Sequence, residues 1–173
     1  MTAESSETIR VAHTPQDYAA FADLVTQYVE WFRERYRDDA SFVSRVFGHQ
    51  SLEKELQALA AVYGPPNGRT LLADRQGVIC GAAAYRHLAV GTCEMKRLFV
   101  PSRFTGAGIG RRLCQALIRL AREDGYSMMK LDSSSLLVEA ITMYKSMGFR
   151  DCAPYHDYPG DLMPYLVFME LPL

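Results

Sequence analysis

Hydrophobic residues in the first third of the chain recur at the spacing of an amphipathic helix. Thr14 and Pro15 suit an N-cap and a first helical position, and apolar side chains then follow every three or four residues to about Tyr36. They are Tyr18, Phe21, Ala22, Val25, Tyr28, Val29 and Phe32. Residues 7–12, just before this helix, predict a short strand.

The next stretch predicts a break in regular structure, a second helix and a hairpin. Residues 38–47 are polar and weakly patterned, which favours an irregular connection. A helix begins at Ser51 and ends before the Gly/Pro-rich turn at 64–68. Strands over 69–73 and 78–86, joined by a short polar turn, then form the hairpin.

From Thr92 onward, short strands alternate with helices. A strand over 94–100 leads through a glycine-rich turn at 106–110 into an amphipathic helix that stops at Gly125. The elements that follow are a strand over 128–132, a helix over 136–147 and strands over 150–153 and 165–171.

This order of elements predicts a single α/β (α+β) domain. Antiparallel runs joined by crossover helices imply a mixed central sheet of about seven strands, flanked on both faces by about four helices. Residues 1–7 are expected to form a loose N-terminal tail and residues 8–173 the domain. A chain of 173 residues fits one domain at roughly 150 residues each, and it can form a core without disulfides or metal.

Composition narrows the class of protein. A formal net charge of −1 and a pI of about 6.4 argue against nucleic acid or an anionic membrane as partner. Apolar runs such as 78–84 are much shorter than a membrane helix, and the polar, acidic N-terminus does not look like a secretory signal. The four cysteines are scattered without a Cys-x-x-Cys pair, which predicts free thiols and no metal site. We therefore expect a cytoplasmic protein.

The glycine-rich turn between a strand and a helix is a candidate phosphate site. Such turns present backbone N–H groups to an anion, and the helix dipole adds favourable charge. The dinucleotide pattern Gly-x-Gly-x-x-Gly fails because Arg111 and Leu113 stand where glycines are required. The Walker A pattern fails at Arg111 and Arg112. A plain tight turn is the alternative to phosphate binding.

Two segments carry a resemblance to a known family. Residues 94–101 read EMKRLFVP and residues 104–110 read FTGAGIG, which together resemble the core of the GNAT acetyltransferases. Residues 140–149, AITMYKSMGF, look like the second signature of that family. The resemblance implies the family's fold and an N-acetyltransferase that uses acetyl-CoA.

The resemblance also implies which residues hold the cofactor. The family's Gln/Arg-x-x-Gly-x-Gly/Ala loop aligns its first position with Thr105, although a register beginning at Arg103 also fits the letters. We prefer Thr105, since backbone N–H groups provide most of the pyrophosphate contacts. The residues expected to bind the cofactor are Leu98, Phe99, Val100, Thr105, Gly106, Ala107, Gly108, Ile109, Gly110 and Arg111.

Acyl transfer from a thioester to an amine needs a neutral amine, a polarised carbonyl and a protonated leaving thiolate. The resemblance places the polarising N–H near Phe99 or Val100. Tyr144 matches the family's general acid, and a phenol of pKa about 10 is protonated at neutral pH; a core tyrosine is the alternative. Glu94 matches a glutamate that accepts the amine proton in some members, directly or through water, but an exposed, ion-paired glutamate fits equally. Asp132 is a weaker candidate.

The acceptor side is less defined. The family shapes this side from the first two helices and the loop between the last two strands, where Trp31 and Tyr155 are the candidate contacts. Aromatic and acidic residues there suit a cationic amine. The expected partner is a small-molecule or peptide amine, and a homodimer is left open. The functional alternatives are an acyl-CoA-sensing module without turnover and a protein or peptide acetyltransferase.

Overall fold

The computed structural model describes residues 7–49 and 51–173, which contain one mixed sheet in the order β1-β2-β3-β4-β5-β7-β6. The strands are β1 Thr8–Val11, β2 Gly68–Arg75, β3 Val78–Ala89, β4 Thr92–Phe99, β5 Met128–Ser134, β6 Arg150–Asp151 and β7 Leu166–Pro172. The helices are α1 Pro15–Arg35, α2 Ala40–His49, α3 Leu52–Leu56, α4 Leu59–Tyr63, α5 Ile109–Glu123 and α6 Val138–Ser146. The mixed α/β fold predicted from the sequence is confirmed.

One pair of neighbouring strands departs from the antiparallel arrangement of the described sheet. All neighbouring strands are antiparallel except β4 and β5, which are parallel. A parallel pair requires a crossover connection, and the glycine-rich turn with α5 provides it. The turn therefore lies at the end of β4, beside the one parallel junction between the described strands.

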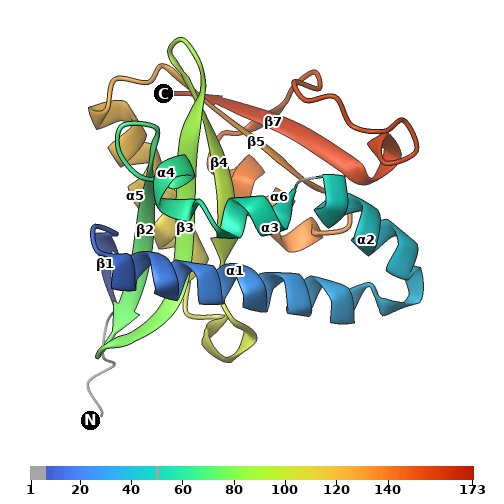
Figure 1. Ribbon diagram of the computed structural model, residues 1–173. Coiled ribbons are helices and arrows are strands. Elements are labelled where there is room, and N and C mark those ends of the chain that lie inside the picture. Colours follow the sequence, from blue (N-terminus) through green and yellow to red (C-terminus); the bar gives the residue numbers. More distant parts are fainter. Residues whose placement is uncertain (1–6, 50) are drawn as a thin grey trace.

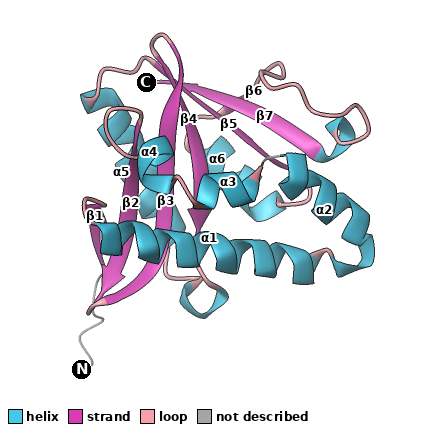
Figure 2. Cartoon of the chain, in the orientation of Figure 1, coloured by secondary structure: helices cyan, strands magenta, loops and turns pink. Residues whose placement is uncertain are grey.

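Helices cover both faces of the sheet (Figures 1 and 2). In Figure 1, α1, α3 and α4 lie in front of the sheet, and α5 and α6 lie behind it. Behind the sheet, Leu113 and Leu117 of α5 pack in one core cluster with Met129 of β5. In front, Phe21 of α1 packs with Leu72 of β2 in a second cluster. The core is therefore divided by the sheet into two apolar layers.

The start of α1 follows the predicted capping pattern. Thr14 is the N-cap, its side chain accepts a hydrogen bond from the Asp17 N–H at 3.1 Å, and Pro15 opens the helix. The Asp17 carboxylate accepts in return from the N–H groups of Thr14 and His13. This reciprocal capping box fixes the first turn.

The connection predicted over residues 38–47 is wrong, because α2 occupies most of it. Phe42, Val43, Val46 and Phe47 form an apolar stripe that packs on α1 through Phe32. The four positions do follow a helical spacing, but the helix is only ten residues long, and a helix this short depends on tertiary packing for its stability.

The single helix expected from Ser51 to Gly64 is also corrected. It is split at 57–58 into two short helices, α3 and α4. With α2 added, six α-helices lie in the described residues where about four were expected. Residues 1–6 of the predicted N-terminal tail lie outside the described residues. Glu7, the last residue of that tail, is held by an ion pair between its carboxylate and Arg75 at 3.5 Å.

Candidate active site

Strand β4 carries a bulge in the middle of the sheet. Lys96 pairs with Ala84 of β3 and Phe99 with Ala82, so two residues of β4 stand opposite a single residue of β3. At the bulge, Arg97 adopts a left-handed backbone with φ of 58°. The irregularity turns the Arg97 side chain toward α3 instead of the face opposite Lys96, where simple alternation would put it.

Beyond the bulge, β4 separates from its parallel neighbour. The pairing of β4 with β5 ends at Glu94 and Lys130, while β5 continues along β7 as far as Ser134. The gap holds a cavity of about 110 Å³ whose lining includes Leu98, Asp132 and Tyr144. We refer to it as the strand-gap cavity. One edge of β4 is therefore left without a neighbouring strand.

The glycine-rich turn lines a larger cavity at the end of β4. Gly106 and Gly108 have φ of 86° and 75°, a backbone region in which a side chain is strained. The first amide bonded across the start of α5 is that of Arg112, to the Gly108 carbonyl, so the N–H groups before it are left for an external acceptor. This glycine-turn cavity measures about 710 Å³.

Most residues expected to bind the cofactor line the glycine-turn cavity. They are Leu98, Phe99, Val100, Thr105, Gly106, Gly108, Ile109, Gly110 and Arg111. Arg111 also donates a hydrogen bond to the Ser146 hydroxyl at 2.9 Å. The Arg103 guanidinium lies over the Phe104 ring, and Arg112 is turned toward Glu7 and the Ala107 carbonyl. Arg111 is therefore the guanidinium of the turn that reaches the cavity.

Tyr144 is almost completely buried at the strand-gap cavity. Its ring packs edge-on against Phe149, with ring centroids 5.7 Å apart. Burial raises the pKa of Tyr144 well above its ordinary value, so the phenol is protonated at any physiological pH. Tyr28, Leu98, Leu137 and Ala140 line both this cavity and the glycine-turn cavity, so the two adjoin.

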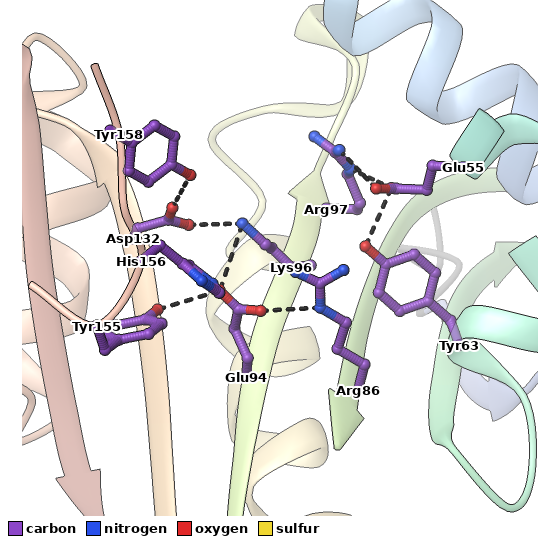
Figure 3. A network of polar contacts seen from close by, with 10 residues as sticks. All are labelled: Glu55, Tyr63, Arg86, Glu94, Lys96, Arg97, Asp132, Tyr155, His156 and Tyr158. Atoms are coloured by element: carbon purple, nitrogen blue, oxygen red, sulfur yellow. Dashed lines mark hydrogen bonds and ion pairs between the residues drawn. The ribbon is translucent and has the colours of Figure 1, made fainter. Parts of the chain in front are cut away.

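Glu94 is fully buried at the centre of a polar network (Figure 3). One carboxylate oxygen accepts from Arg86 Nε at 2.8 Å, and the other lies 3.4 Å from Lys96 Nζ. The same oxygen accepts from the Tyr155 hydroxyl at 3.2 Å and lies 2.7 Å from His156 Nε2. The alternative interpretation is right about the ion pairs with Lys96 and an arginine and wrong about exposure, because the Glu94 side chain is fully buried.

The charges around Glu94 decide its protonation state. Burial alone would raise the pKa of the Glu94 carboxyl, but the positive charges of Lys96 and Arg86 outweigh it and hold that pKa below its ordinary value. An ionised carboxylate only accepts hydrogen bonds, so His156 must carry a proton on Nε2 and a lone pair on Nδ1 when it is neutral. The contact with Glu94 therefore leaves Nδ1 of His156, the ring nitrogen with the lone pair, pointing away from Glu94.

The network continues from Glu94 through Lys96 in Figure 3. Lys96 bonds Asp132 at 2.7 Å, and Tyr158 donates to the same carboxylate. Arg97 bonds Glu55 at 2.7 Å in a neighbouring polar group, which Figure 3 draws without a contact to Glu94. A third cavity, of about 210 Å³, is lined by Glu55, Arg86, Lys96, Arg97, His156, Asp157 and Tyr158. This polar cavity adjoins the strand-gap cavity, because Lys96 and Arg97 line both.

The two predicted acceptor contacts lie in different places. Tyr155 bonds Glu94 in the polar network. Trp31 lines the glycine-turn cavity beside Phe99, and the Arg35 guanidinium lies 5.2 Å from its ring centroid. Arg35 in turn bonds Glu139 of α6 at 3.1 Å, which bridges α1 and α6 at this cavity. Trp31 is therefore grouped with the expected cofactor residues.

Sequence reasoning missed several members of the network. The pairing of Arg86 with Glu94 could have been found, because the two residues are cross-strand neighbours in adjacent predicted strands. Glu55 gave no comparable signal, since it belongs to a short helix far away in the sequence. Within the described residues no cluster of metal-ligating side chains gathers, and every helix is too short or too polar to serve as a membrane span.

Comparison with known proteins places this site in context. The family model described as the acetyltransferase (GNAT) family matches residues 23–149. An uncharacterized N-acetyltransferase of Schizosaccharomyces pombe is 34% identical over 99% of this chain and 98% of its own length. An IAA acetyltransferase of Azospirillum brasilense is 37% identical over 69% of this chain and 74% of its own.

Solved structures share the fold at low sequence identity. The PaiA N-acetyltransferase of Thermoplasma acidophilum, solved in complex with coenzyme A, has a TM-score of 0.68 and 15% identity. The match covers 96% of this chain and 99% of that one. The fold of the present chain is thus that of a protein whose structure contains coenzyme A.

Proposed function

Because the chain belongs to the acetyltransferase (GNAT) family, and is thus an acyltransferase, we propose that it moves the acetyl group of acetyl-CoA to a primary amine by direct attack in a ternary complex. One observation carries this proposal. The glycine-turn, strand-gap and polar cavities adjoin one another along β4. Such a series leaves room for a nucleotide at one end, a thioester in the middle and an amine at the other end.

In this proposal the glycine turn binds the pyrophosphate. The N–H groups at the start of α5 donate to its oxygens, and Arg111 adds positive charge. The pantetheine arm runs along the unpaired edge of β4 into the strand gap. A backbone N–H near Phe99 or Val100 polarises the thioester carbonyl.

The chemistry proposed at the strand gap is a single acyl transfer. The neutral amine nitrogen attacks the acetyl carbon, the C–N bond forms, and the C–S bond breaks as the tetrahedral intermediate collapses. Tyr144 gives its proton to the departing sulfur. Burial keeps this phenol protonated at neutral pH, so its hydroxyl can donate a hydrogen bond to the sulfur as negative charge develops there.

We assign Glu94 an indirect part in proton removal. Its carboxylate is saturated by partners and has a lowered pKa, so it is a weak acceptor of a further proton. His156 is half-buried at the polar cavity, with Nδ1 as its basic atom. The amine proton passes to that nitrogen, and Glu94 fixes the ring and stabilises the imidazolium that forms.

The cysteines support direct attack over an acyl-enzyme. Burial raises the pKa of the Cys93 and Cys114 thiols to about 12, so neither is an available thiolate. Cys80 is buried, and burial also raises the pKa of the partly exposed Cys152. A sensing module without turnover would need the glycine-turn cavity to bind acyl-CoA, but its function would not require Tyr144 or the network around Glu94.

Thermal unfolding with and without ligand tests whether the glycine turn binds acetyl-CoA. Acetyl-CoA at 100 times its dissociation constant should stabilise the protein by about 2.7 kcal/mol, with much smaller shifts from ATP and NADH. Gly108→Asp, which puts a negative charge against the pyrophosphate, should abolish the acetyl-CoA shift. Gly77→Asp is the matched control, because Gly77 has a similar φ of 82° in the β2–β3 turn and lines none of the three cavities.

The same protein is then incubated with acetyl-CoA and a panel of primary amines, and free CoA is measured. Release that depends on the amine supports the transferase. Strong acetyl-CoA binding with no amine-dependent release across small amines and peptides would instead favour the sensing module. Equal stabilisation by all three nucleotides would reduce the turn to a general anion site.

A further inference from the structure

Arg86 presents an unused guanidinium edge to the polar cavity. The residue faces Glu94 across the β3–β4 ladder, and its Nε donates to that carboxylate at 2.8 Å. Within the described residues, its terminal nitrogens Nη1 and Nη2 have no hydrogen-bond partner. An edge with two parallel N–H donors matches a carboxylate, which can accept both.

Most carboxylates of the network lie behind this edge. The Glu94 side chain is 0% exposed and that of Asp132 6%, whereas Arg86 is 31% and His156 28% exposed. A molecule entering the cavity therefore meets Arg86 and His156 before it meets Glu94 or Asp132. The buried anions hold these groups in place but are shielded from an incoming charge.

Asp157 adds an exposed carboxylate to the same lining. Its charge suits the ammonium form in which an amine arrives, before the proton is removed. A cavity of about 210 Å³ is smaller than the ~300–1,000 Å³ of pockets for drug-sized ligands, so the group that it admits is small.

From these contacts we infer that the acceptor is an amine that also carries a carboxylate, which Arg86 binds through its terminal nitrogens while His156 faces the amine. This inference rests on the proposed function and defines its substrate class. It also replaces the cationic amine that the sequence suggested. The chemistry fits a free amino acid through its α-carboxylate, or a peptide whose first residue has an acidic side chain.

The test compares acids with amides that differ only in the carboxylate. Leucine and phenylalanine are offered with their α-amides, and an aspartyl dipeptide distinguishes the peptide source from the free amino acid. Each is scored by acetyl-CoA-dependent CoA release and by thermal stabilisation of the CoA-bound protein. The carboxamide lowers the pKa of the neighbouring amine, so at neutral pH a larger fraction of the amide than of the acid has a neutral, reactive amine. Intrinsic reactivity therefore favours the amides, and a preference for the acids must come from the binding site.

Variants of Arg86 identify the residue responsible. Arg86→Gln should lower kcat/KM for the acid by about tenfold or more beyond any loss for the amide, so the acid-to-amide ratio collapses. Arg86→Lys keeps the charge without the two-donor edge and should give an intermediate ratio. Arg150→Gln, on exposed β6, is the matched control. The ratio cancels any general loss that Arg86→Gln causes through Glu94.

The outcomes separate the two proposals. A preference for acids that Arg86→Gln removes supports the inference. If the wild-type protein accepts amides as well as acids, or the variant keeps the preference, the inference is overturned. If acids stabilise the CoA complex but are never acetylated, the binding site stands and the transferase function fails. If acids neither stabilise the CoA complex of the wild-type protein nor react with it, the inference is wrong. This outcome does not depend on whether Arg86→Gln folds.

Discussion

Tyr144 combines burial with access to a cavity, which is what a proton donor to a thiolate requires. Its ring is held edge-on by Phe149, and the residue lines the gap between β4 and β5. Burial raises its pKa, so the phenol stays protonated at neutral pH and its hydroxyl can donate a hydrogen bond to the thiolate that develops beside it.

Replacing Tyr144 by phenylalanine removes this one proton and keeps the ring. We expect kcat to fall about 10²-fold, with little change in acetyl-CoA affinity or thermal stability. Tyr126→Phe is the matched control, because Tyr126 packs on Tyr85, lines none of the three cavities and should leave kcat unchanged.

Steady-state rates and acetyl-CoA binding are measured for both variants. Unchanged turnover in Tyr144→Phe would make this tyrosine a core residue. Weakened acetyl-CoA binding with normal turnover at saturation would make it a binding contact.

Sequence reasoning reached single residues unevenly. Tyr144 is predicted as a site residue because a signature surrounds it on both sides, and its role stays a prediction. Glu94 is predicted by position, but its surroundings could not be, since Tyr155 and His156 come from a loop about sixty residues away. Long-range partners of this kind depend on tertiary structure, which no local pattern encodes.

At the scale of elements, α1 depends on its first turn. The hydrogen bonds from the His13 and Thr14 N–H groups hold the pKa of Asp17 well below its ordinary value, and Arg10 lies 2.7 Å from the same carboxylate. A depressed pKa in the folded state means that the stabilisation is present above about pH 4 and is lost as the pH falls.

Asp17→Asn should therefore lower the free energy of unfolding by about 1 kcal/mol at pH 7. The difference from the wild-type protein should shrink as the pH falls below about 4, because the unfolded wild type then binds a proton at Asp17 that its folded state does not. Urea unfolding from pH 7 to pH 3 measures it. Asp23→Asn, at an exposed position of the same helix, should stay within about 0.5 kcal/mol throughout. A constant penalty at every pH would contradict the role assigned to the charge.

Elements with strong local signals were predicted, and those that depend on packing were not. The capped start of α1 and the glycine-rich entry to α5 are written in adjacent residues. Helix α2 and the break between α3 and α4 are not, because they depend on contacts with α1 and β4. The bulge at Arg97 likewise depends on how β4 meets β3.

Over the whole molecule, the parallel junction organises the site. The separation of β4 from β5 opens the strand gap, the turn after β4 supplies the N–H groups, and the loop before β7 supplies His156. Because the three cavities adjoin, both substrates can be bound at once. We propose a direct transfer, without an acetylated enzyme, on the basis of this arrangement.

Initial-rate kinetics test that transfer most directly. CoA release is measured while acetyl-CoA is varied at several fixed concentrations of an accepted amine. Double-reciprocal lines that intersect, with no acetylated protein detected by mass spectrometry after acetyl-CoA is added alone, are the result expected for a ternary complex. Parallel lines together with an acetylated protein would show a covalent intermediate and contradict direct attack.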